Sequence, residues 1–297
     1  MENSIDVSTL LRFDSPKDFS SRRAYQAEID SSVHQLERIL GGYSFGKDNY
    51  TQCGLKGCRT LHGKGYVVQT LDGIETNIGK DCGTRHFGQR FEDLEGQFTR
   101  LVEESARRDR VQDAIRQKDA TVQKTVTLLK DCRSWEAEVD RLFKELDRES
   151  SLISVLRAAM RTDGALVVDR QLSAAERELS GGSQRYIRET VGRLYGLSVL
   201  GMKKVSIELQ AEALVPLHEL SDDQLSAMSA SAIRTKAQWL SELEATLLRA
   251  ESYIRSAREF CSQQNWRTFS QAFDAGRHKT TDRGRAILKR LAQQTPV

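Results

Sequence analysis

The sequence predicts a mainly α-helical protein with long, coiled-coil-like helices, one small β-hairpin module and one possible small α+β insertion. Charged residues make up 29% of the 297 residues, and the mean hydropathy is −0.53, as expected for long solvated helices. Apolar residues recur at steps of three and four over long stretches. None of the three prolines lies between positions 17 and 215, so long helices are permitted there.

The N-terminal region, residues 1–42, predicts a single helix over roughly 16–40. Ser15 is a suitable N-cap, and Pro16 suits the first helical position. Apolar residues then recur at helical spacing until Gly41 and Gly42, which mark the end of the helix. The recurring residues are Tyr25, Ile29, Val33, Leu36 and Leu40.

Residues 43–95 form a separate module, in which helical periodicity gives way to a glycine-rich segment. The stretch 65–71 predicts a strand, Asp72-Gly73 is a two-residue hairpin turn, and 74–78 predicts the partner strand. Helical periodicity resumes at about Cys82. The predicted β-hairpin therefore lies between two segments of the chain that both contain cysteine.

Four residues of this module have the spacing of a structural zinc site: Cys53, Cys58, Cys82 and His86. Gly54 and Gly57 allow a tight turn between the first two ligands. Cys82 and His86 are four residues apart, so a helix beginning there places both on one side of its first turn. Three thiolates and one imidazole close the coordination shell, which favours a structural over a catalytic metal.

His62 is an alternative fourth ligand, because Cys58-x3-His62 also has ligand spacing. It can replace His86 or lie beside the site. His86 is favoured because a helix holds it in register with Cys82, whereas His62 lies in a glycine-rich loop.

The order of a Cys53–Cys58 turn, a hairpin around Asp72-Gly73 and a helix carrying Cys82 and His86 resembles a treble-clef zinc finger. The resemblance covers about 45 residues. It departs from the usual pattern in the four-residue gap of the first pair and in the final histidine. It implies a zinc-supported structural module of a kind that engages nucleic acid or protein.

The rest of the chain predicts three further regions. Residues 96–162 form a long helical region, in which the polar window 105–119 is either helix or hinge. Residues 163–216 form a mixed α/β segment with strands at 164–169, 194–200 and 203–209, closed by Pro216. Residues 217–297 form a helical region with a basic tail, and the capping pattern at 221–224 opens its last long helix or helix pair.

Catalytic motifs are absent from the sequence. There is no phosphate-binding loop and no Gly-x-Ser-x-Gly turn, and Cys132 and Cys261 lie on apolar helical stripes that predict core packing. The sequence thus argues against an enzyme, although dispersed carboxylates could still form a hidden site. No apolar run reaches membrane-spanning length and no signal peptide is evident, which predicts a cytoplasmic protein.

Two basic clusters predict noncatalytic binding of DNA or RNA, because phosphate backbones attract lysine and arginine. Four nearby aromatic residues, Tyr43, Phe45, Tyr50 and Tyr66, either stack on bases or form the module's core. The alternative function is a coiled-coil scaffold or assembly protein that docks on proteins, or on a second copy, through the zinc finger and the helical seams. The predicted nucleic-acid contacts are Lys56, Arg59, Lys64, Arg85, Arg277, Lys279, Arg283 and Arg285.

Overall fold

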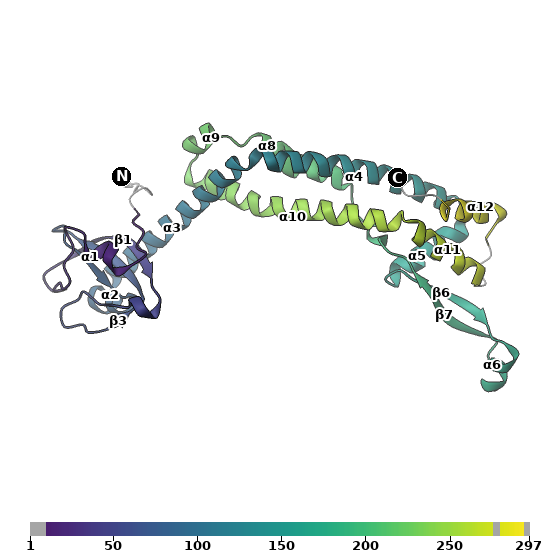
Figure 1. Ribbon diagram of the computed structural model, residues 1–297, viewed down its shortest axis with the longest axis horizontal. Helices are drawn as coiled ribbons and strands as arrows, with labels where there is room; N and C mark the ends of the chain where they lie inside the picture. The colour runs from purple at the N-terminus through teal and green to yellow at the C-terminus, as the bar shows by residue number, and fades with distance from the viewer. Residues whose placement is uncertain (1–9, 276–279, 294–297) are drawn as a thin grey trace. The chain divides into compact units, whose positions relative to one another are not determined.

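The computed structural model describes residues 10–275 and 280–293, and it confirms a mainly helical protein with long helices and small antiparallel sheets (Figure 1). The chain divides into two compact units, and each is described by itself. Unit 1 is Met1–Asp113 with Leu225–Ala237, and unit 2 is Ala114–Gln224 with Gln238–Val297. Across the described ranges, no helix is both long and apolar enough to span a membrane.

Unit 1 is built on a three-stranded antiparallel sheet of order β1–β4–β5, formed by β1 (Leu36–Ser44), β4 (Lys64–Thr70) and β5 (Glu75–Ile78). β4 and β5 form the predicted hairpin, in which Gln69 pairs with Glu75. Gly73 has a φ of 82°, a left-handed conformation that glycine adopts without strain. The predicted turn at Asp72-Gly73 is therefore confirmed.

Both faces of this sheet are covered by apolar side chains. Val67 and Val68 are fully buried and belong to two different apolar clusters, because successive residues of a strand point to opposite faces. The other elements of unit 1 are α1 (Pro16–Ser20), the 3-10 turn η2 (Lys47–Asn49), the paired strands β2 (Thr51–Gln52) and β3 (Leu61–His62), α2 (Lys80–Phe87) and most of α3 (Gln89–Arg116).

The prediction of a helix over 16–40 is wrong beyond its first turn. Ser15 and Pro16 do open a helix, but α1 ends at Ser20, and 36–44 is strand β1. Two irregularities in the β1–β4 register accompany the burial of Leu36 and Ile39 in one apolar cluster, and Leu40 is buried in the cluster on the other face. That spacing imitates a helix. Gly41 lies within the strand, where a Cβ atom would come within 2.3 Å of the Leu11 carbonyl oxygen.

The body of unit 2 is formed by α4 (Lys118–Asp147) and the part of α10 (Ala230–Phe260) from Gln238 onward, which lie side by side (Figure 1). Lys124 and Glu251 join these two helices in an ion pair at 2.8 Å. The window 105–119 is helical apart from Gln117, between α3 and α4. Unit 2 also contains α5 (Ser150–Arg161), α11 (Gln263–Ala275) and α12 (Asp282–Leu291), whereas α9 (Asp222–Ala227) spans the division of the chain between the two units.

The mixed segment of unit 2 differs from its prediction in two places. The strand at 164–169 is confirmed as β6 (Ala165–Gln171), and its partner is β7 (Tyr186–Arg193), with α6 (Ala174–Leu179) between them. The strands predicted at 194–200 and 203–209 are wrong. Those residues form the 3-10 turn η3 (Leu197–Leu200) and the start of a helical run made of α7 (Val205–Glu208), the π-helix η4 (Leu209–Leu214) and α8 (Val215–His218).

The helical run is explained by the four-residue spacing of its buried residues. The seven residues 203–209, which were predicted as a strand, are too few to show that spacing. Val205, Leu209, Ala213 and Leu217 are all buried and lie four residues apart, on one face of a helix. Pro216 does not end the run. The π-helix η4 ends two residues before this proline, and the i→i+5 hydrogen bonds of η4 depart from the α-helical pattern that a proline interrupts.

Candidate metal centre

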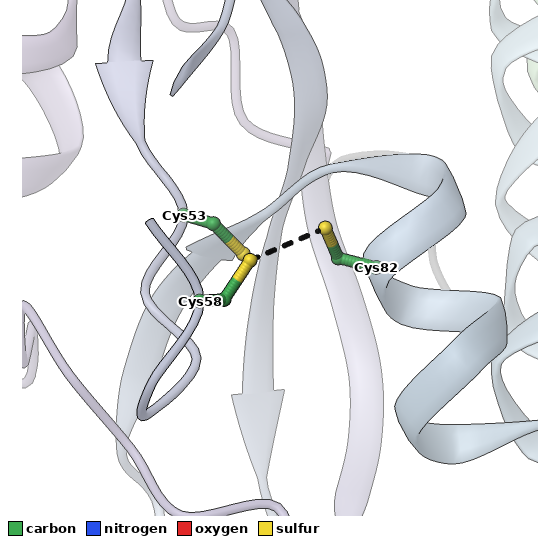
Figure 2. Close-up of side chains that lie close together, drawn as sticks. All are labelled: Cys53, Cys58 and Cys82. Atoms are coloured by element: carbon green, nitrogen blue, oxygen red, sulfur yellow. Dashed lines mark hydrogen bonds between the residues drawn. The ribbon is translucent and has the colours of Figure 1, made fainter. Parts of the chain in front are cut away.

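Three cysteines from two separate segments meet in unit 1. Cys53 follows β2, Cys58 lies in the turn before β3, and Cys82 is in the first turn of α2. Their ligand atoms all lie within 4.8 Å of one another, and the sulfurs of Cys58 and Cys82 are 3.6 Å apart (Figure 2). None of the three forms a disulfide. This group can hold a metal ion.

The turn between Cys53 and Cys58 has the backbone geometry expected from its glycines. Gly57 has a φ of 77°, and the amide of Cys58 donates to the Leu55 carbonyl at 2.9 Å. Gly54 packs so closely on Thr76 that a Cβ atom there would lie 2.0 Å from the threonine hydroxyl. The buried Leu55 side chain anchors the turn in the apolar cluster, which fixes both sulfurs relative to the sheet.

The third sulfur is positioned by the start of α2. Gly79 is the N-cap residue, with extended backbone, and its amide lies near enough to the Cys53 sulfur to lower the pKa of that thiol in part. Gly83, in the same helix, lies against the Phe91 ring, where a Cβ atom would come within 2.6 Å. Two glycines thus bring the Cys82 turn against both the thiol cluster and the core of unit 1.

The environment of the three thiols is uneven. Burial raises the pKa of Cys53 to about 12 and also raises the pKa of Cys82. Hydrogen bonding with Thr60 lowers the pKa of the more exposed Cys58 to about 7. Two buried, adjacent thiols with raised pKa values stay protonated at neutral pH unless a cation replaces their protons.

His86, the fourth predicted ligand, is not part of the group. It is exposed on α2, and its Nδ1 lies 3.2 Å from the Ser31 hydroxyl. His62 does not belong to the three-cysteine group either, but it is partly buried. Its Nδ1 lies 2.9 Å from the Tyr43 hydroxyl, and its Nε2 is buried with no hydrogen-bond partner in the described part of the chain. The structure therefore brings together three of the four predicted ligands and leaves one imidazole nitrogen without a partner nearby.

The predicted nucleic-acid contacts divide into paired and unpaired cations. Lys56 forms an ion pair with Asp30 at 3.3 Å, whereas three others are exposed and form no ion pair with any described residue: Arg59, Lys64 and Arg85. In the basic tail, Arg283 pairs with Glu149 and Arg285 with Asp282, both at 3.7 Å. Arg277 and Lys279 lie outside the described residues.

Most of the predicted stacking aromatics belong to the core of unit 1. Tyr43 is buried, Phe45 stacks on it with ring centroids 4.7 Å apart, and Tyr66 packs edge-on against Phe91. Only Tyr50 is largely exposed, at 47%. In unit 2, Cys132 and Cys261 are buried, which confirms their prediction as core residues.

Comparison of the chain with protein-family models, curated proteins and solved structures finds no match. The function is therefore argued from the site itself. Sequence spacing identified the three thiols but not the residues that support them. Tyr43 and Gly79 are not among the predicted ligands, and only the proximity of Tyr43 to His62 and of Gly79 to Cys53 connects them to these residues.

Proposed function

We propose that this chain is a noncatalytic zinc protein that binds nucleic acid through the surface of its metal module. The observation that carries the proposal is the convergence of Cys53, Cys58 and Cys82 within 4.8 Å, on a segment whose cations Arg59, Lys64 and Arg85 are exposed and without a described acidic partner. Thiolate donors suit a soft or borderline ion. Phosphate attracts unpaired surface cations.

The spacing of two of the sulfurs supports zinc as the ion. A tetrahedral zinc ion with Zn–S bonds of about 2.3 Å separates its sulfurs by roughly 3.8 Å, and the Cys58 and Cys82 sulfurs are 3.6 Å apart. Zinc has no redox chemistry and favours closed thiolate sites in structural modules. The chain order of cysteine turn, β4–β5 hairpin and α2 supports the resemblance to a treble clef.

The three unpaired cations lie within the sequence of the metal module, close to its cysteines. Arg59 directly follows Cys58, Lys64 opens β4, and Arg85 lies three residues after Cys82, close enough to influence its thiol. Lys56 contributes less to the proposal because Asp30 already neutralises it. The tail contributes less for the same reason at Arg283 and Arg285.

A coiled-coil scaffold is the weaker candidate, because the predicted seams are largely used within the chain. Leu129, Leu142 and Leu146 of α4 and Leu243 and Ile254 of α10 belong to one buried cluster of unit 2. Burial inside the monomer leaves these residues little surface for a second helix.

Charge reversal tests the proposal. The variant carrying Arg59→Glu, Lys64→Glu and Arg85→Glu should bind single- and double-stranded oligonucleotides more weakly. The slope of log affinity against log salt should fall by about one for each cation that no longer meets a phosphate. Fluorescence anisotropy across salt concentrations measures both quantities. Metal content should stay at the wild-type level, because none of these residues is a ligand.

The matched control reverses three exposed cations of unit 2, Lys130, Arg161 and Arg258, which form no ion pair with any described residue. It changes the net charge equally, so it should bind as the wild type does if the contact surface is on the metal module. An equal decrease in oligonucleotide affinity in both variants would show that net charge alone, and not a contact surface on the metal module, determines binding. Absence of wild-type binding at low salt would refute nucleic-acid recognition.

A further inference from the structure

The imidazole of His62 is held in one orientation by the core of unit 1. Its Nδ1 lies 2.9 Å from the Tyr43 hydroxyl, and the two rings stack at an interplanar angle of 21°. Tyr43 is itself buried, and Asn77 donates to its hydroxyl at 3.4 Å. Because Nδ1 and Nε2 lie on different sides of the ring, this contact directs Nε2 away from Tyr43.

The Nε2 atom that results is buried and has no hydrogen-bond partner in residues 10–275 and 280–293. A buried polar atom without a partner costs about 1–3 kcal/mol. Native structures rarely retain one unless an ion or another group satisfies it. When the Nδ1 hydrogen is donated to the Tyr43 oxygen, Nε2 carries the free lone pair that a metal ion requires.

The position of His62 connects it to the thiol cluster. Its ring lies against Gly79, where a Cβ atom would come within 3.1 Å of Cδ2 and 3.4 Å of Nε2. The amide of the same glycine lies near enough to the Cys53 sulfur to affect its pKa, and Gly79 stands three residues before Cys82. One backbone residue thus contacts both the imidazole and a candidate ligand.

The register of β2 and β3 gives an independent indication. Thr51 pairs with His62, and the Cys53 amide donates to the Thr60 carbonyl, which continues the same register by two residues. Side chains two residues apart on a strand share a face, as do directly opposed residues. His62 and Cys53 therefore lie on one face of this small hairpin.

We propose that His62, through Nε2, is the fourth ligand of the metal centre, in place of His86. This inference rests on the proposed metal site and adds its closing ligand. His86 is exposed and already engages Ser31 through Nδ1. With His62, the donor set is three thiolates and one neutral imidazole, and Tyr43 orients the imidazole as a hydrogen-bonded partner of a metal ligand.

The test uses the full-length protein loaded with zinc or cobalt(II). His62→Ala should weaken zinc binding at least about 100-fold, more than the removal of a group that only orients a ligand, whereas His86→Ala should bind as the wild type does. Chelator competition measures the affinities. Tyr43→Phe should weaken binding about tenfold while keeping the wild-type cobalt spectrum, because it removes only the hydrogen bond to Nδ1.

His62→Cys gives a spectroscopic answer that does not depend on the alanine variant folding. A fourth thiolate should increase the sulfur-to-cobalt charge-transfer absorption relative to the wild type, which a structural role for His62 would not produce. Wild-type cobalt spectra in both His62→Cys and His62→Ala would overturn the inference, as would loss of metal in His86→Ala alone. A wild-type protein that binds no metal would instead refute the metal centre itself, independently of the nucleic-acid result.

Discussion

The two units bury their apolar residues in different ways. Unit 2 has one large apolar cluster that runs from Leu129 on α4 to Leu291 on α12. Unit 1 has two smaller clusters on opposite faces of a three-stranded sheet, and two of its buried members are the cysteines Cys53 and Cys82. Unit 2 therefore buries enough apolar side chains to be stable without a metal ion. In unit 1, by contrast, two of the buried core positions are occupied by thiols.

Unit 1 also contains a chain of polar side chains that runs through its core to His62. The Tyr25 hydroxyl donates to the Asn77 side chain at 2.6 Å, Asn77 donates to Tyr43, and Tyr43 contacts His62. Buried polar networks stabilise a fold only when every member is satisfied. This chain ends at the unpartnered His62 Nε2, and the proposed metal ion would satisfy that atom.

The largest expected effect is that of metal removal on unit 1. Structural zinc contributes about 10–16 kcal/mol to small finger modules, comparable with the whole stability of a typical domain. Chelation, or Cys82→Ser, should therefore unfold the β1–β4–β5 sheet. The amides of α4, and those of α10 from Gln238 onward, should stay protected from hydrogen exchange. Hydrogen exchange resolved by segment measures both units in one experiment.

Cys261→Ser is the matched control for that experiment, since Cys261 is a buried thiol of unit 2. It should leave metal content and the exchange of unit 1 unchanged. Unaltered exchange in β4 and β5 after complete metal removal would show that the metal does not stabilise this fold.

The second effect in size concerns the apolar core of unit 2. Phe269 is fully buried, with edge-on contacts to Trp266 and Phe273 at centroid distances of 6.1 and 5.4 Å. Phe269→Ala should lower the free energy of unfolding by about 3–5 kcal/mol. The decrease should be the same with and without chelator. Urea unfolding followed by α-helical circular dichroism tests this. Leu248→Ala, at a 58% exposed site on α10, should change stability by less than about 0.5 kcal/mol.

The same contrast explains how much of the fold could be predicted from the sequence. The hairpin turn at Asp72-Gly73 and the long helix α4 depend on local chemistry and on sustained periodicity, and both were predicted. The helix over 16–40 was wrong because β1 buries residues on both faces and has two register irregularities, which together give its buried positions a helical spacing. β7 was missed because its residues are mostly exposed and lack an apolar face.

The candidate site was predictable for its three thiols but not for their surroundings or for a fourth ligand. Cysteine spacing was sufficient to place Cys53, Cys58 and Cys82 together. The choice between His62 and His86 depends on a hydroxyl 19 residues before His62 and on a glycine 17 residues after it, and no periodicity reports such contacts. The same limit applies to α7, where the Ser206 amide and hydroxyl both donate to Glu136, 70 residues away.

The smallest effect concerns the tip of the β6–β7 hairpin, which depends on neither the metal nor the apolar core. α6 buries no residue, and its first turn is held by a reciprocal pair of hydrogen bonds between Ser173 and Glu176. Hydrogen bonding with Arg170, followed by that with Ser173, lowers the pKa of the Glu176 carboxyl from 4.5 to about 2. Because the folded pKa is depressed, the stabilisation is present above pH 4.5 and is lost as pH falls through about 2.

Protection of the α6 amides, corrected for intrinsic exchange, should therefore fall between about pH 5 and pH 2, with the α11 amides as an internal reference. Glu176→Gln should remove this dependence, because the amide does not titrate in that range. The effect should stay local, since α6 has no buried side chain to transmit it. A pH dependence of equal size in the Gln variant would assign it to another carboxylate, such as Glu189, which also pairs with Arg170.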